Sequence, residues 1–102
     1  DYDEMAAFNV ISGDIKTETI INAASTVTTD TTDNWADAAT KTLKVLVSAA
    51  GVVTYQIDGA APTASAAFTF DSGEVVIPFV YMLHASDLAG AVTITSWDVG
   101  YQ

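Results

Sequence analysis

The chain has 102 residues, no cysteine, three lysines, no arginine and thirteen acidic side chains, which gives a net charge of -10. This length corresponds to one domain with one core, and the lack of thiols excludes disulfides, thiolate metal clusters and cysteine catalysis. Clustered cations are needed to bind nucleic acids and anionic membranes, so we expect neither as a partner. Because the chain starts at Asp1 without an initiator Met, we expect residues 1–102 to be the ordered or C-terminal part of a longer chain.

The N-terminal third contains one candidate hairpin and one polar stretch. Apolar residues recur over 5–11 and 15–21 on either side of a Ser-Gly-Asp turn, which predicts two strands joined by a tight connection. Residues 23–40 are mostly polar, so we expect a long connection there. Asp33 is a residue type that caps helices, and we expect it to cap one helical turn over residues 34–37.

The middle of the chain has the clearest period of two. In residues 42–48 and 53–57, apolar and polar side chains alternate, and a short Ala-Ala-Gly loop separates the two runs. This pattern predicts a second β-hairpin. Asp58 and Gly59 follow at the end of its second strand, where a turn needs a positive φ that glycine adopts at little cost.

The C-terminal part predicts further strands. A short strand is expected over residues 67–70, with a turn over 71–73. Residues 74–83 are apolar on both faces, which fits a strand covered on two sides or in contact with a partner. Because Pro78 cannot donate to a ladder, this strand should lie at an edge or be bulged.

The last predicted elements are a turn over residues 87–90 and a strand over 91–101, whose apolar phase switches and so predicts a bulge near Ser96. About seven strands with regular turn signals result. The expected fold class is therefore all-β, a single antiparallel two-sheet β-sandwich of the jelly-roll kind over residues 1–102.

Catalytic and cofactor-binding motifs are not visible in the sequence. His84 is the single histidine, and its place after an apolar strand is more typical of an ordinary hydrogen-bonded strand end than of a catalytic base. The three glutamates, Glu4, Glu18 and Glu74, fall on different predicted elements. Nucleophile, zinc-protease and phosphate-loop patterns are missing. We therefore predict that the protein is not an enzyme and holds no organic cofactor.

Two binding sites can be considered. Asp30, Asp33 and Asp37 lie in one polar stretch, and oxygen ligands suit calcium, although loop aspartates more often cap turns and no EF-hand spacing is present. Trp35, with Tyr55, could form a platform for a glycan, although such aromatic residues more often pack over the end of a sandwich. Calcium through the three aspartates and glycan through the two aromatic residues are therefore the candidate ligands.

Some segments carry a family resemblance. Residues 42–47 (TLKVLV) with 51–59 (GVVTYQIDG) are similar to the central hairpin of concanavalin A-like (laminin G-like) jelly rolls, and residues 92–101 (VTITSWDVGY) resemble their closing strand. More narrowly, residues 68–73 (FTFDSG) with 76–79 (VIPF), and then 97–102 (WDVGYQ), resemble virion structural proteins of marine tailed bacteriophages.

The resemblance implies a virion structural protein on the particle surface, either a capsid decoration protein or a fibre or stalk module. It also implies a homo-oligomer that contacts the major capsid protein or other virion proteins. The glucanase pattern of related jelly rolls, Glu-x-Asp-x-x-Glu, is missing, so that activity does not carry over. A carbohydrate-binding lectin-like module and a secreted bacterial surface or filament subunit remain the alternatives.

Overall fold

The structure is a computed structural model that describes residues 2–83 and 91–101. Over these residues the chain is all-β and has no helix, so no helix that could cross a membrane is found there. The strands are β1 (Met5–Ile11), β2 (Asp14–Ile20), β3 (Val27–Asn34), β4 (Leu43–Val47), β5 (Val52–Ile57) and β6 (Phe68–Thr69). The expected all-β class is confirmed.

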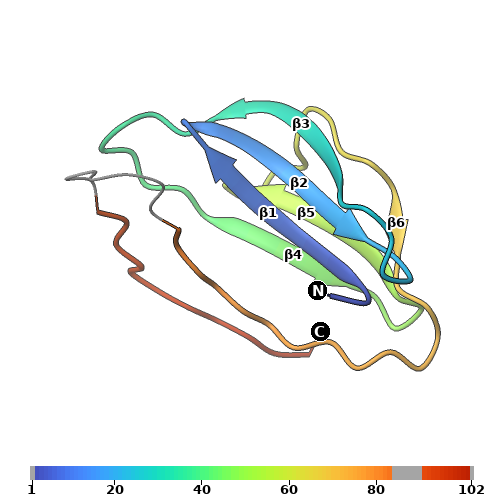
Figure 1. The fold of residues 1–102 in the computed structure, drawn as a ribbon. Helices are drawn as coiled ribbons and strands as arrows, with labels where there is room; N and C mark the ends of the chain where they lie inside the picture. The colour runs from blue at the N-terminus through green and yellow to red at the C-terminus, as the bar shows by residue number, and fades with distance from the viewer. Residues whose placement is uncertain (1, 84–90, 102) are drawn as a thin grey trace.

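The strands form two antiparallel sheets, ordered β1-β2-β3 and β4-β5-β6, that lie one in front of the other (Figure 1). The predicted N-terminal hairpin is confirmed, since β1 pairs with β2 from Met5 opposite Ile20 to Ile11 opposite Asp14. Ser12 and Gly13 form its two-residue turn with φ values of 54° and 86°. Two successive positive φ values are what a type I′ turn requires, and this turn matches the twist of the strands.

Residues 23–40 contain a strand, so the prediction of a long connection with a helical turn over 34–37 is wrong. β3 pairs with β2 along Thr17 to Thr19, and its four threonines favour extended backbone because their branched side chains fit a pleated surface. The strand shows little apolar alternation, because it lies at a sheet edge and most of its side chains are exposed. Asp33 lies inside this strand and caps no helix.

A bulge interrupts the pairing of β2 with β3. Its centre is Thr31, which is fully buried, and whose hydroxyl donates a hydrogen bond to the carbonyl of Ile15 and accepts one from the amide of Asp33. Thr32 follows with a φ of 65°, and its amide donates to the carboxylate of Asp30 at 2.8 Å. The bulge is thus fixed by side chains that bond the backbone groups that the ladder leaves unpaired.

The second sheet confirms the predicted central hairpin. β4 pairs with β5 from Leu43 opposite Ile57 to Val47 opposite Val53. Asp58 and Gly59 have φ values of 52° and 85°, which confirms the expected turn. β6 adds to β5 over only two residue pairs, so the expected strand over 67–70 is present but shorter.

The core lies between the sheets. Val53, Tyr55 and Phe70 form a buried cluster, and side chains of β1 pack against it, including Phe8, whose ring meets that of Tyr55 edge-on with centroids 5.2 Å apart. On the first sheet, however, the most enclosed positions include Thr17 and Thr31 beside Ile15. The interior is therefore strongly apolar on one sheet and partly polar on the other.

The prediction of strands over residues 74–83 and 91–101 is wrong, because neither segment belongs to a strand. The prediction of a bulge near Ser96 is wrong as well, since a bulge needs a strand ladder to interrupt. The expected turn over 87–90, like His84, lies outside the described residues. The sheets comprise six strands over 2–83 and 91–101 rather than about seven. An extended apolar run becomes a strand only when another strand satisfies its backbone groups, and these segments have no such neighbour within the described parts of the chain.

Candidate functional site

One side of the molecule has two strand edges with which no other described strand pairs. β1 and β4 are both terminal in their sheets, contact each other across the layers and face the side along which the C-terminal segment runs (Figure 1). We call these two edges the open side. On the opposite side, the edge of β3 is covered, because the amide of Ala64 donates to the carbonyl of Thr31 and that of Thr63 to the carboxylate of Asp33.

The inward face of β4 is incompletely covered. Val45 and Val47 are paired with Tyr55 and Val53, so their side chains point to the same face as these two core residues. Tyr55 is only 4% exposed, yet Val45 and Val47 are 39% and 42% exposed. The core therefore extends to the open side and ends there with no covering strand from residues 2–83 or 91–101.

The second part of the site is the C-terminal arm, which we define as residues 74–83 and 91–101. It is extended, outside the two sheets and rich in large exposed apolar side chains, with Val75 at 86% and Leu83 at 83% exposure. The others are Val76, Ile77, Phe79, Val80, Tyr81, Met82, Val92, Ile94, Trp97, Val99 and Tyr101. So many exposed large apolar side chains in two short segments are unusual on a protein that functions alone.

The arm is fixed at its beginning to the part of the chain that precedes it and contains the two sheets, which we call the body. Gly51 has a φ of 79° and lies so close to Phe70 that a Cβ added at this glycine would be 2.6 Å from the Phe70 carbonyl oxygen. The amide of Asp71 donates to the carboxylate of Glu4 at 3.0 Å. The ring of Phe79 then stacks on that of Tyr2, with centroids 5.4 Å apart. These contacts set the direction in which the arm leaves the body.

Charge is unevenly distributed between body and arm. Desolvation and the neighbouring carboxylates of Asp71 and Glu74 raise the pKa of Glu4, although the Asp71 amide opposes the shift. Residues 75–83 carry no charged side chain, and β4 carries Lys44 and no acid. The base of the arm is thus acidic, whereas residues 75–83 and the edge of β4 are the parts where a second acidic protein would be repelled least.

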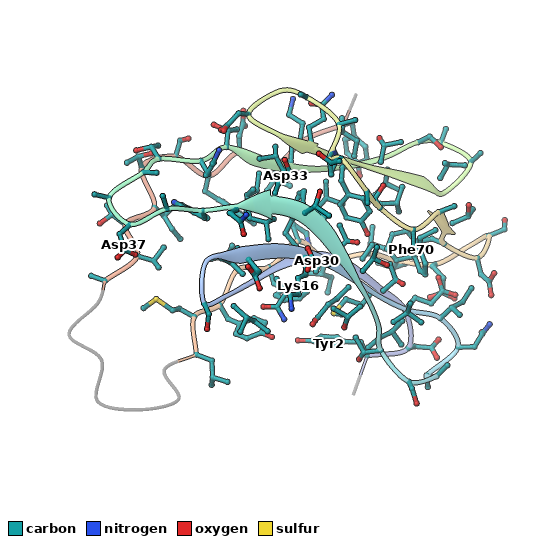
Figure 2. All side chains as sticks on the ribbon, turned by 90° about the horizontal axis from the view of Figure 1, so that it is seen from above. Tyr2, Lys16, Asp30, Asp33, Asp37 and Phe70 are labelled. Atoms are coloured by element: carbon teal, nitrogen blue, oxygen red, sulfur yellow. The ribbon has the colours of Figure 1, made fainter. Side chains whose placement is uncertain are left out.

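The predicted calcium ligands do not meet. Asp30 lies opposite Lys16 on β2, Asp33 accepts the amide of Thr63, and Asp37 follows in the next turn. Figure 2 shows the three aspartates spread along β3 and the loop after it. In the part of the chain that the structure describes, no three acidic or histidine side chains form a group that could hold a metal ion. Calcium binding stays a prediction without geometric support.

The predicted glycan residues lie in different environments. Tyr55 is a core residue, so its ring is not offered to a ligand at the surface. Its hydroxyl is buried without a hydrogen-bond partner, and burial raises the pKa of Tyr55 to about 12. Trp35 is half-buried, and its indole N–H donates to the carbonyl of Ala39 at 2.8 Å. The packing role of Trp35 and glycan binding both stay predictions.

Two surface hollows have no arrangement typical of catalysis. One, of about 220 Å³, lies on the outer face of β4 and β5 between Leu46 and Val52, and the other, of about 480 Å³, lies beside Tyr2 and Ile20. Neither hollow is lined by a carboxylate or a lysine. The arm and the open side are therefore the candidate functional site.

Sequence reasoning identified the apolar arm but not its attachment or the open side. The two apolar faces of residues 74–83 predicted either a strand covered on both sides or a contact with a partner. The contacts of Glu4 and Gly51 with the base of the arm are long-range, and single residues of these types give no signal of them. Comparisons of the chain with protein-family models, curated proteins and solved structures find no match.

Proposed function

We propose that this chain is a non-enzymatic structural module that acts through protein–protein contacts on the surface of a virion, as a capsid decoration protein or a fibre or stalk module. The observation that carries the proposal is the C-terminal arm. Its large apolar side chains are exposed over two segments, and burying such side chains against a partner is the main driving force of protein association.

The resemblance to phage virion proteins supports this setting. Of the three segments that carry it, residues 68–73 directly precede the arm, residues 76–79 lie in it, and residues 97–102 overlap its end. The acidic body fits the same role, because like-charged surfaces keep neighbouring copies from associating in other orientations. The major capsid protein or another virion protein is the proposed partner.

A jelly-roll architecture follows naturally from the same proposal. The body has two three-stranded sheets whose edges β1 and β4 are free on one side. The two segments of the arm are long enough to add one strand to each sheet, which would give the four strands per sheet of a jelly roll. On this proposal the sandwich is completed by assembly.

The test uses particles purified from the source culture. Immunogold labelling with an antibody against the chain, together with mass spectrometry of the particles, should place the protein at regular positions on the virion surface. A chain that is present in the culture but missing from purified particles would contradict the proposal.

A rebinding assay then tests the arm. Particles stripped of the protein should bind Val80→Asp about tenfold more weakly than the unaltered chain, because a charge in an apolar contact costs at least about 1.4 kcal/mol. Thr54→Asp, which adds the same charge to an exposed position on β5, is the matched control and should bind within about twofold. Equal binding of the two variants would exclude the arm as the contact.

A further inference from the structure

We propose that residues 74–83 of one copy add as an edge strand to β4 of a second copy, so that two copies exchange their arms. The inference rests on the proposed function and deepens it, since it names the first partner of the arm as a second copy of this chain. Strand addition of this kind combines main-chain hydrogen bonds, which give affinity, with side-chain contacts, which give register.

Donor and acceptor are both present in one chain. β4 has a free edge, and beside it the core ends at the half-exposed Val45 and Val47. Residues 75–83 run along the same side but form no backbone–backbone hydrogen bond with any described residue (Figure 1). Two copies can satisfy each other by one symmetric exchange, which is the two-fold arrangement that most homo-oligomers adopt.

Charge favours this pairing over other contacts between copies. Each body is strongly acidic, because ten of the thirteen acidic residues lie in residues 1–73, before the arm. Residues 75–83 are uncharged, and β4 contains Lys44 as its sole charged residue. Contact between arm and β4 therefore brings together the two elements that repel a second copy least.

The surface area is sufficient for a stable dimer. The accessible surface of the chain is 7569 Å². A compact protein of this mass exposes about 5,500 Å², so the excess is about 2,000 Å² per chain. A standard interface buries about 800 Å² per partner, so a dimer needs only part of this excess. The radius of gyration, 14.1 Å, likewise exceeds the value of about 13 Å for a compact chain of this length.

Pro78 fixes which residues pair with β4. In a strand, alternate residues direct their amide and carbonyl groups to the same neighbouring strand, and a proline is tolerated where its nitrogen faces away from the ladder. The nitrogen of Pro78 must then face away from β4, as must the backbone amides of Val76 and Val80. The backbone amides and carbonyls of Ile77, Phe79 and Tyr81 face β4 and bond to it. The outer edge lacks one donor at Pro78, which opposes addition of a further strand.

A proline substitution at the inward and at the outward position tests this register. The unaltered chain should form a dimer of twice 10.7 kDa, measured by sedimentation over a range of concentrations. Ile77→Pro removes an amide that bonds to β4 and should weaken dimerisation at least tenfold, whereas Val80→Pro is the matched control and should weaken it less than about threefold. A chain that stays monomeric, or equal losses for both variants, would overturn the inference.

Cross-linking separates exchange between copies from closure within one copy. Because the natural chain has no cysteine, Val45→Cys and Phe79→Cys can be made as two single variants of different tagged mass, mixed and joined by a short bismaleimide. Exchange predicts a cross-linked pair that contains one chain of each variant. If the mixture gives no such pair while the double variant cross-links within a monomer, the arm closes on its own β4 and the inference is wrong.

The two proposals fail in different ways. A dimer with the predicted register that is missing from purified virions would remove the proposed function and leave arm exchange intact. A monomer that nevertheless labels the virion surface would overturn arm exchange and leave the structural role in place.

Discussion

Gly51 holds the turn of the second hairpin against the residue that follows β6, and Gly51→Ala is expected to destabilise the protein strongly. Its φ of 79° is a left-handed conformation that side chains rarely adopt, and the added Cβ would be 2.6 Å from the carbonyl oxygen of Phe70. The Phe70 amide also donates to the Gly51 carbonyl at 3.0 Å, so the backbone cannot move apart without stretching this bond.

The expected magnitude follows from these two costs. The left-handed conformation costs an alanine about 1–2 kcal/mol. Weakening the hydrogen bond between Phe70 and Gly51 costs about 1 kcal/mol more. The free energy of unfolding should thus fall by about 2–3 kcal/mol, which is a large part of the about 5–15 kcal/mol that a domain has in total.

Gly59→Ala is the matched control, because Gly59 has a similar φ of 85° but no atom within 4 Å of the added Cβ. It should show the conformational cost alone, about 1–2 kcal/mol. Urea unfolding followed by circular dichroism measures both variants, and an unchanged slope with a lower midpoint identifies a loss of stability. If the two alanine variants unfold at the same urea concentration, the close approach of Phe70 contributes nothing and the reasoning is refuted.

Three further predictions concern stability. Tyr55→Phe removes a buried hydroxyl without a partner and should raise Tm by about 4 °C, a gain of about 1 kcal/mol that thermal unfolding would show. Thr31→Val leaves the Ile15 carbonyl unpaired and should cost about 2 kcal/mol in urea unfolding, and no loss would contradict the bulge geometry. Hydrogen bonds from Lys41 and a backbone amide lower the pKa of Asp58 below its ordinary value of 3.8. Asp58→Asn should therefore be less stable than the unaltered chain at neutral pH, and the difference in unfolding free energy should shrink as the pH falls below 3.8. A difference that stays constant with pH would show that the charge of Asp58 does not stabilise the fold.

The sequence allowed the two hairpins to be predicted because their signals are local. A Ser-Gly turn between apolar runs and an Asp-Gly turn after an alternating strand each specify structure within a few residues. β3 was missed because its threonines and aspartates lie at an edge and give no apolar period. Its pairing depends on β2 and on the hydroxyl of Thr31, which are contacts that a single segment does not reveal.

The candidate site could be predicted in part for the same reason. The apolar faces of residues 74–83 are a local property, and they predicted either a strand covered on both sides or a contact with a partner. The structure has no strand there, and the partner stays a prediction. The aspartates at 30, 33 and 37 are near in sequence, but an extended strand directs neighbouring carboxylates apart, so spacing alone could not show whether they converge. The open side depends on which strands end up at the edges of the sheets, which sequence patterns do not state.

The partly polar interior of the first sheet has a thermodynamic consequence. Unfolding exposes Thr17, Thr19 and Thr31 where many sandwiches would expose valine or isoleucine. Exposed polar surface lowers the heat capacity of the unfolded chain, whereas exposed apolar surface raises it. The increase in heat capacity on unfolding should therefore fall below the usual value of about 1.2–1.5 kcal/mol/K for 100 residues. The curve of free energy against temperature should then be shallow, and the body should keep nearly constant stability between cold and warm water, which scanning calorimetry can measure.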